Sequence, residues 1–346
     1  MATPQTSGNV DRPIFTKQAF LDLEVELERA GPHIQYTGRN GSRFKKVNPL
    51  PGQGFVEAPP NSMVIRNFIE FKGERTLKFA KSKGWDQWFT PVIVSTRPIH
   101  GPNITASTAM THMKNEIRDW ESNEICRSLS NTLKAILPST INKIIAFGLG
   151  AIGNLDLSSP FRIYDIQSYR EHAYVLTIAR ALNEIKGANE DEVAIYLQDP
   201  TYTTVCREVL TGTFGFNIIN GYGARGFAMV DENTLMLGHH PNFPLREIIA
   251  DIARPAAMCV PFFDKESFDK LPTRNKVILA DIPSARVHAM LQEYEEESIP
   301  GSYPKSSLPD LAEWRHEWME EPFHDTKEEP EMNNDPRPSK ATLCLD

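Results

Sequence analysis

Cysteines and long apolar runs are scarce in this sequence, and basic residues are outnumbered by acidic ones; each of these features disfavours a class of protein. The 346 residues include only four cysteines, with no C-x-x-C pair, which disfavours a zinc site or a disulfide scaffold. No apolar run approaches the roughly 18 residues that a membrane-spanning helix needs. The net charge of −8 disfavours general nucleic-acid binding, because binding to phosphates requires clusters of basic residues.

The chain also lacks the short motifs that identify common catalytic sites. It contains no G-x-S-x-G, P-loop or H-E-x-x-H pattern, so the sequence indicates no metal and no particular reaction. The first residues have no apolar stretch of the kind that forms a secretory signal. With reduced thiols, we expect a cytoplasmic or nuclear protein, and we favour a non-catalytic role while leaving the enzyme question open.

The most informative stretch that is present is an apolar segment that enters a glycine loop, at residues 141–153 (I-N-K-I-I-A-F-G-L-G-A-I-G). Apolar, β-branched residues without polar alternation are typical of a strand covered on both faces, as in a parallel sheet. The loop contains Gly148, Gly150 and Gly153 in the spacing G-x-G-x-x-G. We expect the rest of the chain to pack around this strand.

Apolar segments of strand length alternate with amphipathic helices over residues 140–296, which is the pattern of βαβ units. We therefore predict an α/β fold: a Rossmann-like, doubly wound, mostly parallel sheet with helices on both faces. The expected strands are 144–148, 192–198, 216–219, 234–238, 257–263 and 276–282. The expected helices are 107–137, about 169–187, 203–211, 244–253 and 284–296.

The sequence outside this alternating region differs in composition. We predict four parts: a disordered segment at 1–14, an N-terminal extension at 15–106, a main domain at 107–298 and a largely disordered tail at 299–346. Within the extension we expect a helix at 17–30 and short strands at 64–71 and 89–95. Residues 310–335 hold ten acids against two bases, so the chain's negative charge belongs to this tail. Trp314 and Trp318 lie within it. They either dock onto a protein partner through the segment 300–346 or fold back on the domain.

In a doubly wound sheet, ligands bind beyond the carboxyl ends of the strands. The residues expected at that edge include Gly148, Gly150, Gly153, Asp199 and His240. The glycine spacing favours either a nucleotide or S-adenosylmethionine loop, or a tight turn without a ligand. Asp199 lies 49 residues after Gly150, whereas dinucleotide-binding proteins place their ribose-binding acid about 20 residues on. Asp199 therefore either bonds a ribose hydroxyl or caps the turn that follows it.

His239 and His240 end an apolar strand and, as neighbours in a strand, point to opposite faces. They cannot form a two-histidine metal site with each other. His240 is the candidate for a general base or a metal ligand, and the alternative is a structural histidine.

Three segments of the chain resemble the SRR-like domain family, named for Sensitivity to Red Light Reduced. They are the strand and loop 143–150 with the preceding Trp120-Glu121-Ser122, the strand ending in Asp199-Pro200-Thr201-Tyr202, and the strand ending in His239-His240. The resemblance covers residues 107–263 and is similar in style to fungal members. The chain departs from the family pattern at Val175 and His239. The resemblance implies an intracellular, Rossmann-like regulatory protein, of a family linked to light signalling and rhythm in plants and to haem biosynthesis and rhythm in animals. It implies no established reaction.

Three functions follow as hypotheses. The first is a regulatory protein that senses a small ligand at the strand-end cleft. The second is a nucleotide- or S-adenosylmethionine-dependent enzyme in which the loop Gly148–Gly153 approaches the cofactor, Asp199 bonds a ribose and His240 acts as a base. The third is a scaffold that recruits a protein partner through the acidic tail. We expect no nucleic-acid or membrane partner.

Overall fold

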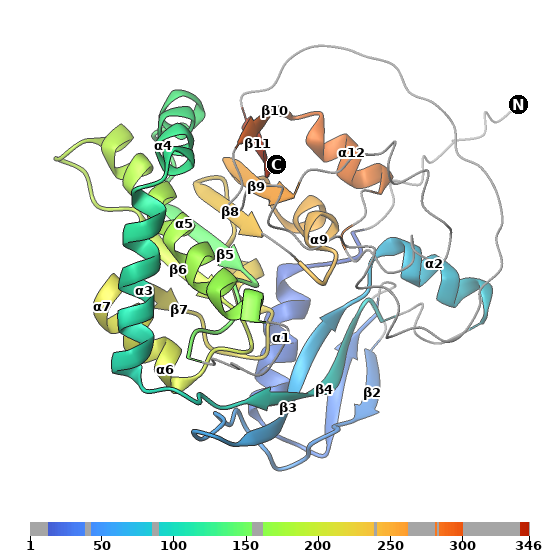
Figure 1. Ribbon diagram of the computed structural model, residues 1–346. Helices are drawn as coiled ribbons and strands as arrows, with labels where there is room; N and C mark the ends of the chain where they lie inside the picture. The colour runs from blue at the N-terminus through green and yellow to red at the C-terminus, as the bar shows by residue number, and fades with distance from the viewer. Residues whose placement is uncertain are drawn as a thin grey trace, which may run out of the picture.

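The computed structural model has at its centre a seven-stranded sheet in which every strand is parallel to its neighbours (Figure 1). The structure describes residues 13–38, 43–84, 90–153, 162–238, 241–261, 281, 284–299 and 340–345. The strand order is β10-β11-β9-β8-β5-β6-β7. The strands are β5 (Lys143–Phe147), β6 (Ala194–Gln198), β7 (Asn217–Ile218), β8 (Thr234–Gly238), β9 (Ala257–Pro261), β10 (Tyr294–Ile299) and β11 (Lys340–Leu345).

The chain winds outward from β5 in both directions, which confirms the predicted Rossmann-like fold. It runs from β5 through β6 to β7 on one side, then crosses to β8 and β9 on the other. Neighbouring residues of β5 alternate between the two hydrophobic clusters that flank the sheet, with Ile144 in one and Ile145 in the other. This alternation follows from the period of two in a strand, and the burial of both sets explains why the strand sequence has no polar side.

One face of the sheet is covered by helices that follow or precede β5. They are α3 (Ala106–Glu121), α4 (Glu124–Ile136), α5 (Arg162–Lys186) and the helical segment made of α6 (Thr204–Cys206), the π-helical turn η2 (Arg207–Thr211) and α7 (Gly212–Phe214). Trp120 of α3 donates from Nε1 to the hydroxyl of Thr177 on α5 at 2.9 Å, and both side chains are buried. The buried indole N–H thus has a partner, as large amphipathic side chains in a core require.

The opposite face is covered by the N-terminal extension together with later helices (Figure 1). The extension consists of α1 (Lys17–Glu28), the hairpin of β1 (His33–Thr37) and β2 (Arg43–Val47), α2 (Glu74–Ser82), and the antiparallel pair β3 (Met63–Phe71) and β4 (Val92–His100). The later helices are α8 (Arg225–Met229), α9 (Leu245–Ile252) and α12 (Ala285–Leu291). Phe20 and Phe71 of the extension share one cluster with Phe147 of β5 and Phe227 of α8. The extension is therefore packed into the core of the sheet domain.

Two helix predictions need correction. The single helix expected over 107–137 is two helices, because Asn123 caps the second one: its side chain accepts a hydrogen bond from Ile125 N at 2.9 Å. The helix expected to begin near 169 begins at Arg162, so Ser168 lies inside it and is not a helix cap. The S-x-x-E spacing that predicts a cap is also compatible with a helix interior.

The C-terminal part of the chain differs most from the prediction. The helix expected over 284–296 ends at Leu291, and Tyr294–Ile299 is the edge strand β10. Three consecutive glutamates in β10 are exposed, and charged side chains are common on edge strands. Residues 340–345, predicted to belong to a largely disordered tail, form β11 between β9 and β10. The acidic segment 300–339 therefore connects two neighbouring strands of the sheet. That segment and the expected strand residues 276–280 and 282 lie outside the described residues.

A substitution at Leu343 tests whether β11 belongs to the sheet. Leu343 is fully buried and belongs to the same hydrophobic cluster as Ile144 of β5. Leu343→Ala should lower the free energy of unfolding by about 2–5 kcal/mol, the usual cost of emptying a buried leucine site. Leu21→Ala, at a position that is 41% exposed on α1, should change it by less than about 0.5 kcal/mol. Urea denaturation measures both, and equal midpoints for the two variants would contradict the placement of β11.

A buried carboxyl group joins α9 to the extension. Glu247 is 3% exposed, and its Oε2 accepts a hydrogen bond from Glu74 N in the first turn of α2 at 2.7 Å. Burial raises the pKa of Glu247 to about 7, against the lowering effect of that hydrogen bond. Since the folded pKa lies above the unfolded value, the folded state binds more protons, and this contribution to stability is lost as pH rises from about 4.5 to 7.

Glu247→Gln should therefore flatten the pH dependence of stability. Relative to the variant, the wild-type protein should lose on the order of 3 kcal/mol of unfolding free energy between pH 4.5 and 7.5. Urea denaturation across this range measures the difference, with Glu232→Gln, at an exposed glutamate, as the matched control. Parallel pH profiles for wild type and Glu247→Gln would show that the buried carboxyl does not titrate in this range.

Candidate functional site

The glycine loop leaves the carboxyl end of β5, at the point where the strand order reverses between β5 and β8. All three glycines have left-handed backbone conformations, with φ of +70° at Gly148, +77° at Gly150 and +104° at Gly153. Gly148 N donates to the carbonyl of Gln198 at 3.1 Å, which continues the ladder with β6. Residues with a Cβ rarely adopt these backbone angles, so the turn itself requires glycine.

The structure brings two of the predicted site residues into direct contact. Gly150 N donates to Asp199 Oδ2 at 2.8 Å. The other carboxylate oxygen of Asp199 accepts hydrogen bonds from the backbone N–H of Thr201 at 2.8 Å and from its hydroxyl at 2.6 Å. Asp199 thus caps its own turn, as one reading of the sequence predicts, and also holds the glycine loop. Its predicted bond to a ribose stays a prediction.

Packing restricts the glycine positions as well. A Cβ at Gly150 would collide with the hydroxyl of Ser168 on α5, and one at Gly153 would lie 2.9 Å from Val205 Cγ1. The carbonyl of Gly153 accepts hydrogen bonds from Asn103 N and Ile104 N, at 3.0 and 3.3 Å, just before α3. The spacing of these two glycines therefore matches close approaches within the protein, which the sequence pattern alone does not distinguish from a cofactor loop.

A buried polar group that sequence reasoning missed lies beneath the loop. His172 of α5 is fully buried; its Nδ1 lies 2.6 Å from the carbonyl of Ser168 and its Nε2 lies 2.9 Å from the hydroxyl of Tyr202. A carbonyl only accepts, so Nδ1 carries the proton and the Tyr202 hydroxyl donates to Nε2. Burial lowers the pKa of His172, which favours this neutral form. The sequence carries no signal for this contact, because the partner on α5 is a backbone carbonyl that any residue at position 168 would supply.

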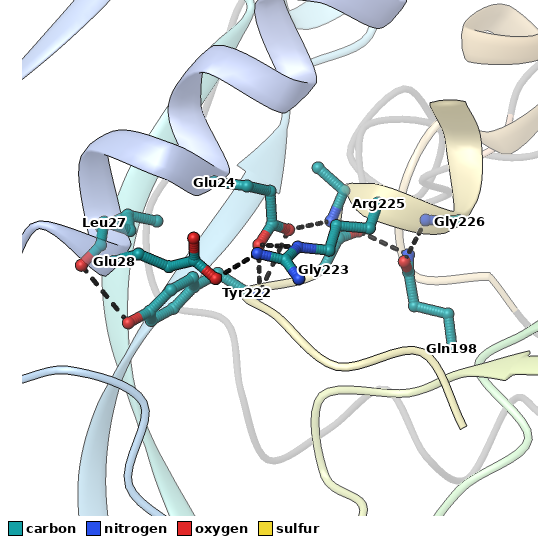
Figure 2. Close-up of polar contacts among 9 residues, drawn as sticks. Glu24, Leu27, Glu28, Gln198, Tyr222, Gly223, Arg225 and Gly226 are labelled. Carbon is teal, nitrogen blue, oxygen red and sulfur yellow. Dashed lines mark hydrogen bonds and ion pairs between the residues drawn. The ribbon is translucent and has the colours of Figure 1, made fainter. Parts of the chain in front are cut away.

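The next strand-end turn, between β7 and α8, is held by the N-terminal extension (Figure 2). The carboxylate of Glu24, only 1% exposed, accepts hydrogen bonds from Tyr222 N at 2.9 Å and Ala224 N at 2.8 Å. Backbone N–H groups of one turn that point to the same place form an anion-binding concavity, and here Glu24 of α1 fills it. Burial raises the pKa of Glu24, while these hydrogen bonds and nearby Arg225 oppose the rise.

Gln198 connects this turn to the glycine loop. Its side-chain nitrogen donates to the carbonyl of Gly223 at 2.7 Å, and its side-chain oxygen accepts from Gly226 N at 2.5 Å (Figure 2). Its backbone carbonyl accepts from Gly148 N. The two strand-end turns are thus parts of one hydrogen-bonded network that reaches α1 through Glu24.

His240, the predicted base, lies outside the described residues. Within the part of the chain that the structure describes, no three His, Cys, Asp or Glu side chains gather in a way that could hold a metal ion. Nor is any helix in those ranges both long and apolar enough to cross a bilayer.

The electrostatics of the loop restrict which chemical groups it can bind. In a dinucleotide site, the backbone N–H groups after the first strand face the pyrophosphate. Here the N–H of Gly150 already faces the carboxylate of Asp199, which would repel a phosphate at the same place. Unless Asp199 moves, this corner of the edge suits a hydroxyl or cationic group.

Two alanine substitutions separate the packing role of the loop from its backbone conformation. Gly148→Ala and Gly150→Ala both place a side chain at left-handed φ, at a cost of about 1–2 kcal/mol. Only Gly150→Ala also collides with Ser168, and overpacking adds about 1–3 kcal/mol. Urea denaturation should show the larger loss for Gly150→Ala. Equal losses of unfolding free energy in the two variants would mean that the Ser168 side chain moves aside without cost.

Comparison with known proteins identifies a family that this chain resembles. The family model of the SRR1 domain matches residues 128–326, more than half of the chain. The matched part includes the glycine loop, Asp199 and the β7–α8 turn, whereas Glu24 lies outside it. No curated protein and no solved structure matched the chain. The chain belongs to the SRR1 domain family.

Proposed function

We propose that this SRR1-domain protein is a regulatory protein that senses a small molecule at the carboxyl edge of the sheet, beside the glycine loop. The observation that carries the proposal is the 2.8 Å bond between Gly150 N and Asp199 Oδ2, which joins the ends of β5 and β6 beside the switch point of a doubly wound sheet. Ligands of such sheets bind in the crevice at this point. The bond joins the two turns that a ligand there would contact.

The hydrogen-bond network gives the ligand a route to the rest of the molecule. A ligand that attracts Asp199 competes with Gly150 and Thr201 for its oxygens. The backbone next to it is joined through Gln198 to α8, and the turn before α8 is joined through Glu24 to α1. A ligand acts as a signal only if it interacts differently with two arrangements of such a network. The two arrangements proposed here are Asp199 bonded to the loop and Asp199 bonded to the ligand.

An S-adenosylmethionine- or nucleotide-dependent enzyme is the second candidate. Asp199 ends the strand next to β5, the place from which Rossmann proteins bond a ribose hydroxyl. S-adenosylmethionine carries no phosphate and has a sulfonium cation, so a carboxylate at the glycine loop does not repel it. A dinucleotide would bring its pyrophosphate towards that carboxylate. Among the cofactors considered from the sequence, the geometry favours the S-adenosyl group.

Recruitment of a protein partner by the acidic segment remains a third proposal. The acids and tryptophans of this segment lie between β10 and β11, so both of its ends are joined to neighbouring strands of the sheet. Cytoplasmic or nuclear residence is likewise proposed, on the sequence composition.

Calorimetry and thermal shift against S-adenosylmethionine, S-adenosylhomocysteine, adenosine, ATP and NAD test the ligand site. We expect the ligands without phosphate to stabilise the wild-type protein more than NAD or ATP does. Asp199→Asn should lower their affinity at least tenfold, about 1.4 kcal/mol, because it removes the charge from the carboxylate. Asp191→Asn, at an exposed aspartate before β6, is the matched control.

Two results of the panel would count against the proposal: no shift with any ligand, or equal affinity in wild type and Asp199→Asn. Recovery of the ligand after incubation separates the two leading candidates. An unchanged ligand supports sensing, and its conversion supports the enzyme.

A further inference from the structure

A second charged residue is buried beside the strand-end edge, and it comes from the extension. Arg66 of β3 is 2% exposed, and its Nη2 is buried without a hydrogen-bond partner among the residues that the structure describes. Its Nη1 is 3.5 Å from the carbonyl of Val56, at the limit for a hydrogen bond, and its guanidinium lies over the ring of Phe55 at 4.4 Å. A buried guanidinium with an unused N–H is costly, since its desolvation is not compensated.

The neighbours of Arg66 place it at the same edge as the glycine loop. Phe55, on which it stacks, contacts Tyr222 edge-on at 6.0 Å, and Ile69 N of β3 donates to the carbonyl of Tyr222 at 2.9 Å. Burial lowers the pKa of Arg66, and the negative charges of Glu57 and Asp199 oppose this lowering. Asp199 is the carboxylate that holds the glycine loop. Arg66 therefore belongs to the part of the extension that packs against the β7–α8 turn.

A neighbouring arginine shows what Arg66 lacks. Arg97 is its direct partner across the β3–β4 pair and stacks in the same manner, with its guanidinium 4.2 Å from the ring centre of Phe68. Arg97 is more exposed, and it also contacts the carboxylate of Glu70 at 3.4 Å. Two like charges directly opposite each other in a sheet are unfavourable, so an anion near Arg66 would relieve both this repulsion and the unused N–H.

A partly exposed ion pair adjoins Arg66, because Glu57 follows Val56, whose carbonyl is the one near Arg66 Nη1. Glu57 and Arg207 both act electrostatically on Arg66 and form an ion pair of 2.6 Å with each other. Their side chains are about a quarter exposed, 27% for Glu57 and 26% for Arg207. The group of charges thus extends from the buried guanidinium to the surface, with the Glu57 carboxylate already bound to the outer arginine.

We propose that Arg66 and Arg207 bind the carboxylate or phosphate group of the ligand held at this edge, and that Glu57 is the internal carboxylate with which that group competes. Arginine suits this task because its planar fork binds either anion with two parallel hydrogen bonds. The inference rests on the proposed ligand site and specifies its ligand: a dipolar small molecule, with a hydroxyl or cationic part near Asp199 and an anionic part near Arg66.

Small anions test the inference without knowledge of the whole ligand. Phosphate and acetate are titrated separately into the full-length protein at constant ionic strength, with chloride as the reference, and the melting temperature is followed. We expect a saturable rise of about 2–4 °C at tenfold the dissociation constant for at least one of the two anions. A response to phosphate alone assigns a phosphate-bearing ligand, and a response to acetate alone assigns a carboxylate.

Three variants test the roles of Arg66 and Glu57. Arg66→Met should abolish the anion response while leaving the anion-free melting temperature unchanged or higher, because it removes a buried unpaired charge. Glu57→Gln should raise the anion affinity at least threefold by removing the competing charge. Arg97→Met, the same substitution on the neighbouring strand, should keep the response. If Arg66→Met does not fold, Arg66→Lys should fold and bind the anion more weakly, since it lacks the fork.

The absence of a saturable response in wild type, an equal response in Arg66→Met, or an unchanged affinity in Glu57→Gln would each overturn this assignment. The test is independent of the ligand panel. If adenosyl ligands bind through Asp199 while small anions have no effect, only the arginine site is wrong. If the anions bind through Arg66 while no ligand of the panel binds, the arginine site is correct and the ligand is not one of the adenosyl compounds.

Discussion

The buried carboxylate of Glu24 is the contact on which the arrangement of the strand-end edge depends. It takes the place of an external anion in the backbone concavity of the β7–α8 turn, where Tyr222 N and Ala224 N both donate to it. A carboxylate with so little exposure would be strongly destabilising without these donors. The contact fixes α1 against the sheet domain, and the carbonyl of Tyr222 in the same turn fixes β3 through Ile69 N. The extension is therefore a structural part of the edge.

This arrangement places opposite charges on two sides of one edge. Asp199 is contributed by the sheet domain and lies at the glycine loop, whereas Arg66 is contributed by the extension. The family match begins at residue 128 and contains only the first of these. A site built from both would join a property of the SRR1 domain to a property of this chain's own N-terminal region. That combination is the physical basis for the dipolar ligand proposed above.

The sequence was sufficient for the fold class because the central strands of the sheet carry a strong local signal. The unbroken apolar run of β5 and the alternation of strands with helices predicted a doubly wound sheet, and the structure confirms it. The misses have physical reasons. Asn123 breaks a helix by capping a new one, which apolar periodicity does not reveal. β11 is six residues long and pairs with strands far away in the sequence, so no local pattern predicts it.

Only part of the candidate site could be predicted. The glycines and Asp199 follow from the rule that strand ends meet at one edge, and the structure places Gly150 and Asp199 in contact. Glu24, Arg66 and His172 have ordinary sequence contexts, and their importance arises from burial that only tertiary packing creates.

Amide hydrogen exchange tests most directly whether the extension and the sheet form one unit. We predict that the amides of Ile69, Tyr222 and Ala224 open with free energies within about 1 kcal/mol of that of Ile145 in β5. Opening of these three amides at several kcal/mol below Ile145 would contradict the account, because the extension would then detach while the sheet stays folded.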